Sequence, residues 1–273
     1  MKSYKDTANK IIDFLFKSQV IAKDQVIDMS KDSGILKTRL IRDDKKEYKY
    51  YIKSKSKNSI IISLDKNFKN SSEIKVNEFF RTDFNNYVGN KANKKIEIKH
   101  ISKKLKAVHG MHTLLYRVIT YFLKTRRFKE IPNLIRFFNS ELSRQKSGDL
   151  SDIPGVTWKL VNLSKNKIVL KCCDSGGIYD RFINDEGTYY PPQVAGDYYA
   201  DAYSAYCFAK KYLDTKDKSY LDATLQAINF VIDNYNDYKP TRIVWPHKDF
   251  KNLPIIETYE MLSNKIDKNK LKY

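Results

Sequence analysis

The sequence predicts a mainly α-helical protein with a small β-containing region near its N-terminus. Apolar residues recur at helical spacing near both ends of the chain and again between residues 107 and 143. Short β-prone runs separated by polar, turn-forming residues interrupt this pattern between residues 35 and 64. A chain of 273 residues is long enough for one large domain or two small ones with a buried core.

The first region, residues 1–150, is expected to contain one helix, several short strands and then a pair of helices. Residues 4–18 have one apolar stripe at helical spacing, which predicts the first helix. Three short strands are expected at residues 35–41, 48–52 and 59–64. The helical pair is expected at residues 107–125 and 130–143.

The second region, residues 151–273, begins within a Gly- and Pro-containing boundary segment at residues 147–155. Two short strands are expected at residues 156–163 and 168–171. Residues 199–213 and 220–231 then follow helical spacing, and their short connection predicts an antiparallel hairpin. A third helix is expected after Asp249, with Pro254 in its first turn.

Three segments of the second region resemble the six-hairpin, or (α/α) toroid, superfamily of glycosidases and polysaccharide lyases. Asp174-Ser175-Gly176-Gly177-Ile178-Tyr179-Asp180 resembles the Gly-Gly turns between toroid helices. Tyr203 to Ala227 is similar to the helical hairpin of these proteins, with Lys216 in place of the usual turn glycine. His247 to Asn252 resembles a later loop. The resemblance implies a partial (α/α) toroid, and among its members glucuronyl C5-epimerases and uronate lyases are most similar.

The resemblance also implies a carbohydrate-processing site on loops beside helices. The candidate catalytic residues are Asp197, Asp201, His247 and Tyr190. Hydrolases of this type use paired carboxylates, whereas lyases and epimerases remove the C5 proton with Tyr or His. Asp197 and Asp201 lie four residues apart at a helix start and are expected on one face. Asp197 has an alternative explanation as a helix N-terminal charge.

Further polar and aromatic residues of this region are candidates for substrate binding. They are Asp180, Arg181, Tyr189, Trp245 and Asp249. All except Trp245 have a structural alternative: Asp180 and Arg181 as an ion pair, Tyr189 with Tyr190 as loop anchors, and Asp249 as a helix N-cap. The sequence leaves these alternatives open.

The net charge of +19 is concentrated in the first region. Residues 1–150 contain 34 Lys and Arg against 16 Asp and Glu, whereas residues 151–273 contain 17 against 16. Such a field favours an anionic partner, namely nucleic acid, acidic lipid or acidic polysaccharide. A Lys-rich composition without functional meaning is the alternative, and only Lys103–Lys106 and Arg126–Lys129 form compact basic patches.

Several function classes are excluded by missing motifs. The sequence has no Gly-rich phosphate-binding motif, no HExxH and no GxSxG. Three cysteines without CxxC spacing indicate neither a disulfide framework nor a zinc site. We therefore expect no metal or other cofactor. No apolar run reaches transmembrane length, and no signal-peptide core follows Met1, so a cytoplasmic protein is expected.

Three hypotheses of function remain. The leading one is an enzyme that acts on an anionic, uronate-containing polysaccharide by lyase, epimerase or hydrolase chemistry. The second is a non-enzymatic protein that binds nucleic acid or another acidic surface through the basic first region. The third is a degenerate toroid that serves as a scaffold. The sequence does not indicate the oligomeric state.

Overall fold

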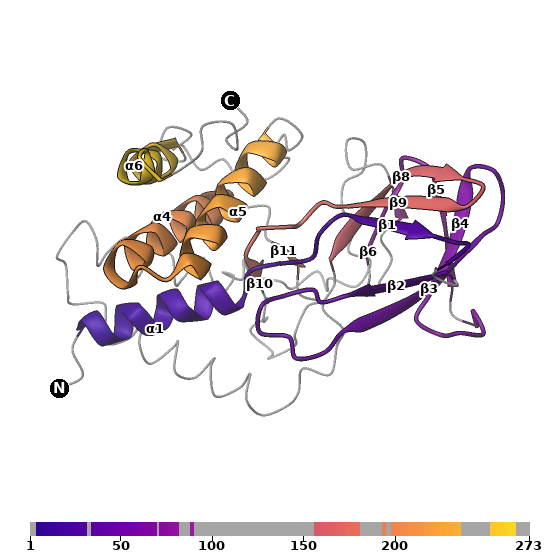
Figure 1. The fold of residues 1–273 in the computed structure, drawn as a ribbon, viewed down its shortest axis with the longest axis horizontal. Coiled ribbons are helices and arrows are strands. Elements are labelled where there is room, and N and C mark those ends of the chain that lie inside the picture. The colour runs from indigo at the N-terminus through magenta and orange to yellow at the C-terminus, as the bar shows by residue number, and fades with distance from the viewer. Residues whose placement is uncertain are drawn as a thin grey trace, which may run out of the picture. The chain divides into compact units, whose positions relative to one another are not determined.

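A computed structural model of the chain describes residues 4–31, 34–69, 71–81, 88–89, 156–180, 193–194, 198–235 and 252–265. These residues contain four helices and eleven short strands (Figure 1). They divide into two compact units. The β unit comprises the described residues of 20–89 and 156–175. The helical unit comprises the described residues of 4–19 and 176–265.

The β unit contains a five-stranded antiparallel sheet built from distant parts of the chain. Its strand order is β1-β9-β8-β6-β7. The bounds are Gln25–Asp28 (β1), Lys167–Cys172 (β9), Thr157–Ser164 (β8), Phe79–Arg81 (β6) and Val88–Gly89 (β7). β1 pairs with β9, with Gln25 opposite Leu170, although more than a hundred residues separate them. Non-local pairing therefore holds this sheet together.

A four-stranded antiparallel sheet completes the β unit. Its strands follow sequence order, β2-β3-β4-β5. The bounds are Ile35–Thr38 (β2), Tyr48–Ser54 (β3), Ser59–Ser63 (β4) and Ser71–Lys75 (β5). The segment before β1 joins this sheet through a bridge between Val20 and Ile41, and Ile21 N donates to Leu40 O at 2.9 Å.

Alternate residues of the strands form the core of the β unit. In β3, Tyr50 and Ile52 are buried, whereas Lys49 and Lys53 are exposed. The period of two is that of a sheet with one buried face. The largest fully buried side chains of this unit are Trp158, Tyr50, Phe80, Leu36, Leu40, Ile60, Ile62 and Ile74.

The helical unit contains a hairpin, two further helices and a small two-stranded sheet. The bounds are Tyr4–Lys17 (α1), Tyr198–Thr215 (α4), Lys218–Tyr235 (α5) and Asn252–Leu262 (α6), with β10 (Tyr179–Asp180) and β11 (Gln193–Val194) as the sheet. α4 and α5 form the predicted hairpin, and α1 packs on it through Ile11, Leu15 and Phe208. None of the described helices is long and apolar enough to cross a bilayer.

Buried polar contacts fix the segment that enters the hairpin. The Gln19 amide donates to Gly176 O at 3.0 Å and to Ala223 O at 2.8 Å. Gly176 has a φ of +89°, and a Cβ there would lie 2.1 Å from Gln226 O in α5. Glycine is thus required at this point of the Gly-Gly turn, because the turn packs directly on a helix backbone.

The predicted fold class, a mainly α partial toroid, is wrong. The described residues form antiparallel sheets of five, four and two strands and also four helices, which is a mixed α and β architecture. The expected β excursion is in fact a complete unit, because strands on both sides of residue 150 pair with one another. Periodicity within each segment does not report such distant pairing.

Individual elements agree with the sequence more closely than the fold class does. The first helix, the hairpin helices and the third helix lie within a few residues of their predicted positions. β2, β3 and β4 also lie at the predicted runs, as do β8 and β9. β1, β5, β6 and β7 were not predicted. The boundary at residues 147–155 and the helical pair at 107–143 lie outside the described residues.

Candidate functional site

Most side chains of the predicted carbohydrate site lie outside the part of the chain that the structure describes. Asp180 belongs to β10, where its backbone pairs with Gln193, and its side chain is not described. Asp201 lies in the first turn of α4. The residues outside the described ranges are Arg181, Tyr189, Tyr190, Asp197, Trp245, His247 and Asp249. Their assigned roles stay predictions.

Asp201 has a clear structural contact. Its side chain is 1% exposed, and its Oδ1 accepts a hydrogen bond of 2.7 Å from the Ile178 backbone N–H. A carboxylate in the first helical turn is also favoured by the helix dipole. Asp201 thus fastens the start of α4 to the segment after the Gly-Gly turn. A catalytic role for it stays a prediction.

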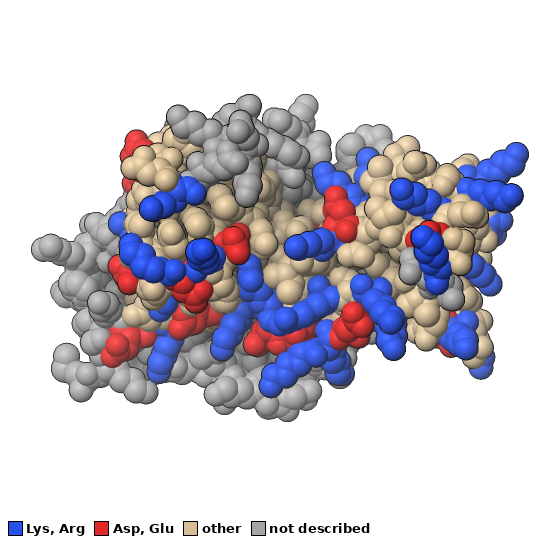
Figure 2. All heavy atoms as spheres, in the orientation of Figure 1, with Lys and Arg blue, Asp and Glu red and all other residues tan. Residues whose placement is uncertain are grey.

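Within the described residues, the surplus of positive charge lies in the β unit. The described part of this unit contains 19 Lys and Arg against 9 Asp and Glu, and that of the helical unit contains 8 against 10. Figure 2 shows basic side chains spread over the strands, with few acidic ones among them. The four lysines of residues 156–175 belong to this surplus, although they follow residue 150.

The outer face of the four-stranded sheet has a cluster of lysines around a tyrosine. Lys49, Tyr51 and Lys53 alternate with the buried residues of β3, so all three lie on the outer face. Lys37 of β2 lies directly opposite Lys49. We call Lys37, Lys49, Tyr51 and Lys53 the lysine face. The three lysines are exposed and Tyr51 is half-buried.

The cross-strand pair of Lys37 and Lys49 is a like-charge contact. Directly opposite residues of an antiparallel pair have Cβ atoms about 5 Å apart, and like charges at that position are destabilising. Among the described residues, neither Lys37 nor Lys49 has a carboxylate within 4.0 Å. The sheet therefore places two cations together without a described counter-charge.

The five-stranded sheet repeats this arrangement. Lys159 of β8 lies directly opposite Lys171 of β9, and the Lys159 ammonium is 5.4 Å from the centroid of the Phe79 ring. A second cross-strand lysine pair beside an aromatic ring thus occurs within the same unit. In contrast, Lys167 lies opposite Asp28, where the charges are complementary.

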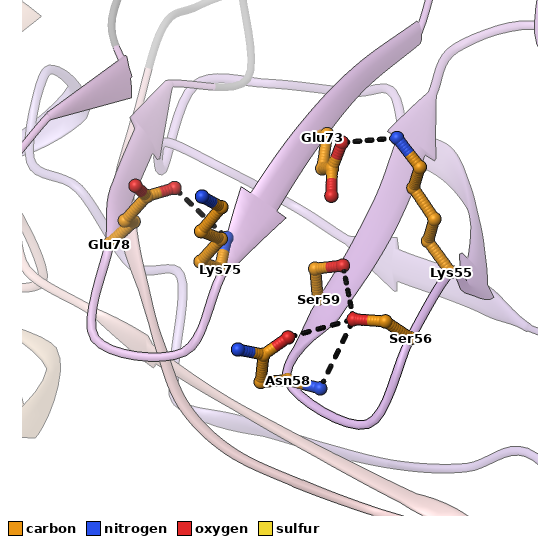
Figure 3. Close-up of polar contacts among 7 residues, drawn as sticks. All are labelled: Lys55, Ser56, Asn58, Ser59, Glu73, Lys75 and Glu78. Atoms are coloured by element: carbon orange, nitrogen blue, oxygen red, sulfur yellow. Dashed lines mark hydrogen bonds and ion pairs between the residues drawn. The ribbon is translucent and has the colours of Figure 1, made fainter.

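Two carboxylates of this region have polar partners of their own (Figure 3). Glu73 lies on the outer face of the four-stranded sheet, because Ile61 is directly opposite both Lys53 and Glu73. Glu73 of β5 forms an ion pair with Lys55, and the hydrogen bond from Lys55 lowers the pKa of Glu73 below its usual value. Glu78 accepts a hydrogen bond of 2.9 Å from the Lys75 backbone N–H. Among the described residues, neither carboxylate lies within 4.0 Å of Lys37, Lys49 or Lys53.

The described part of the chain offers neither an activated cysteine among Cys172 and Cys207 nor a group of metal ligands. Burial raises the pKa of the Cys172 and Cys207 thiols, which disfavours their reactive thiolate form. Within the described residues no group of three His, Cys, Asp or Glu side chains could hold a metal ion. The surface chemistry that these residues offer is cationic and aromatic.

Comparison with known proteins provides no relative for this chain. It matches no protein-family model, no curated protein and no solved structure. The resemblance to six-hairpin enzymes therefore stays a prediction. Functional inference depends on the residues and geometry described above.

Sequence reasoning did not identify the lysine face. Lys37, Lys49 and Lys53 lie outside the two compact basic patches of the sequence, and Lys37 and Lys49 lie in different predicted strands. One signal was present: Lys49 and Lys53 alternate with apolar residues, which predicts a shared face within β3. The register of β2 against β3 came only from the structure.

Proposed function

We propose that this chain binds an anionic polymer through the lysine face of its β unit. The pair of Lys37 and Lys49, together with Lys53 on the same face, is the observation that supports this proposal. An anionic ligand relieves the repulsion between the opposed ammonium groups. Binding and sheet stability are thereby coupled through the same charges.

The chemistry of lysine favours binding without sequence recognition. Lysine is a flexible point charge, whereas arginine offers the planar fork that reads phosphate or guanine in a bidentate manner. Lysine provides 16 of the 19 cations in the described β unit. The proposed binding is therefore electrostatic, and its strength follows the ionic strength.

Polymer binding is common to the two leading hypotheses from the sequence. A uronate polymer and a nucleic acid both present closely spaced anions. Lyase, epimerase or hydrolase action stays a prediction, because only Asp201 among the proposed site residues has a described side chain. The β unit supports binding, independently of any reaction.

Salt-dependent binding provides the test. The full chain is titrated against a labelled single-stranded oligonucleotide and a heparin oligosaccharide, at salt concentrations from about 50 to 200 mM. We expect the logarithm of the binding constant to fall linearly with the logarithm of salt. Each neutralised charge contributes about 0.7 to the slope for a single strand. Replacing Lys37, Lys49 and Lys53 by Ala should thus reduce the slope by about 2.

The control removes the same charge from the helical unit. Lys210, Lys218 and Lys265 are exposed, and their replacement by Ala should leave the slope unchanged. Equal loss of binding in both triple variants would mean that net charge alone is responsible. Binding that does not respond to salt would refute the proposal.

A further inference from the structure

Tyr51 lies in the middle of the lysine face. It is two residues from Lys49 and two from Lys53 on the same strand, which places successive side chains about 7 Å apart along the face. In the register of the sheet, Ile35 and Ser63 lie opposite Tyr51. An aromatic ring thus lies between cations on its own strand and uncharged residues on the neighbouring strands.

A second aromatic ring lies beside the same cations. The Lys53 ammonium is 4.3 Å from the centroid of the Phe68 ring. Phe68 follows β4, in a loop organised by the Asp65 carboxylate, which accepts backbone hydrogen bonds from Asn67 at 3.0 Å and Lys69 at 3.2 Å. The ring and the ammonium are therefore held together at the end of the sheet.

The backbone at Phe68 is strained. Its φ is 56°, in the left-handed region, which a bulky side chain rarely adopts. Strain of this kind persists where the surrounding structure imposes it, and it is concentrated at functional sites. The hydrogen bonds to Asp65 hold the loop in this conformation. The loop therefore positions an aromatic ring next to Lys53 at the energetic cost of a left-handed backbone at Phe68.

We infer that the ligand of the lysine face is a single-stranded nucleic acid, with a base stacked on Tyr51 and phosphates on Lys37, Lys49 and Lys53. The inference rests on the proposed function. To the electrostatic binding proposed above it adds base stacking on Tyr51, because proteins that bind single strands combine a cationic surface with rings on which bases stack.

The aromatic ring distinguishes among anionic polymers. Every base has a π face that can stack on Tyr51, and each such contact is worth about 5- to 150-fold in affinity. A uronate or sulfate polymer has saturated rings, which can contact Tyr51 through C–H groups but not by π stacking. In a duplex the bases are already stacked on one another, so a flat sheet face reaches only the backbone. The single strand uses both features of the face.

An abasic oligonucleotide separates stacking from charge. The full chain is titrated with an oligothymidylate of about 12 nucleotides, within the usual range of site sizes, and with an abasic strand of the same length. For Tyr51→Leu, which removes the π face but keeps an apolar side chain, we expect about 5- to 150-fold weaker binding of oligothymidylate. Binding of the abasic strand should not change. Tyr51→Phe should retain both affinities.

The outcomes distinguish this inference from the proposed function. Equal affinity of Tyr51→Leu and the unaltered chain for oligothymidylate, with salt-dependent binding intact, would overturn the stacking inference alone. Tighter binding of a heparin oligosaccharide than of oligothymidylate would also overturn it and assign the face to a polysaccharide. Absence of salt-dependent binding to every polymer would overturn both. In a Trp245→Phe background, fluorescence of the buried Trp158 confirms in each variant that the β unit is folded. Tyr51→Ala provides a second variant without the ring.

Discussion

The two units of this protein differ in charge although they have similar described lengths. The β unit contains 81 described residues with 19 cations and 9 carboxylates, whereas the helical unit contains 75 with 8 and 10. A lysine-rich composition would raise the cation count of both units. Among the described residues the surplus instead lies in the β unit alone.

The units also differ in how their charges are arranged. In the helical unit, Lys211 donates to Asn9 Oδ1 at 2.9 Å and lies 3.5 Å from Asp13 Oδ1. Asp13 also accepts a hydrogen bond of 2.6 Å from the Tyr220 hydroxyl. The ion pair of Lys211 with Asp13 thus joins α1 to the hairpin of α4 and α5. In the β unit, Lys37 faces Lys49. Lys211 thus contributes to helix packing in the helical unit, whereas Lys37 and Lys49 of the β unit face each other without an ion pair to a described carboxylate.

The largest effect is expected where the helical unit depends on close packing. Gly176→Ala places a Cβ 2.1 Å from Gln226 O at a φ of +89°. The turn or α5 must shift, and we expect a loss of roughly 3 kcal/mol or more in the free energy of unfolding. Urea unfolding followed by circular dichroism measures this loss in the helices. In a Trp245→Phe background, Trp158 fluorescence reports the β unit separately.

An unchanged circular dichroism midpoint in Gly176→Ala would contradict the close contact between the Gly-Gly turn and α5. A fall in the Trp158 midpoint by the same amount would show that the units unfold together. The two units would then not be stabilised separately, and their stabilities could not be compared.

A smaller effect of opposite sign is expected at the hairpin turn. Lys216 connects α4 to α5 with a φ of 60°, and its N–H donates to Tyr212 O at 2.7 Å. Glycine adopts this conformation without the cost of a Cβ, so Lys216→Gly should stabilise the helical unit by about 1 kcal/mol. Thermal unfolding measures the change. Lys210→Gly, within α4, is the control and should destabilise by about 0.5–1 kcal/mol.

The smallest effect concerns the opposed lysines of the β unit. Lys37→Glu replaces a like-charge pair by a complementary one, so the β unit should gain about 0.2–1 kcal/mol of stability while polyanion binding weakens. Trp158 fluorescence and the oligonucleotide titration measure the two changes. Lys167→Glu is the control, because it places a carboxylate opposite Asp28 and should destabilise. A parallel loss of stability and binding in Lys37→Glu would mean that the lysine pair is structural.

Local elements of the fold were predictable because their signals are local. The apolar stripe of α1, the hairpin α4–α5 and the alternation in β3 depend on residues close in sequence. Lys216 lies where the resemblance to six-hairpin enzymes implies a turn glycine, and the structure shows that this position adopts a left-handed conformation. The candidate carbohydrate site was read from the same kind of local pattern and stays a prediction.

The alternating pattern of β3 follows from the order of the amino acids alone, since a period of two assigns side chains to faces without any partner strand. The excess of lysine follows from the composition alone. Which cations meet on a face depends on strand register and on pairing between distant segments. Lys37 faces Lys49, and Lys159 faces Lys171, only because the backbone hydrogen bonds of two sheets align them. A shift of one residue would turn these side chains to the other face. The basic character of the chain was therefore evident from composition, whereas its concentration into a lysine face with Tyr51 at the centre was decided by tertiary pairing.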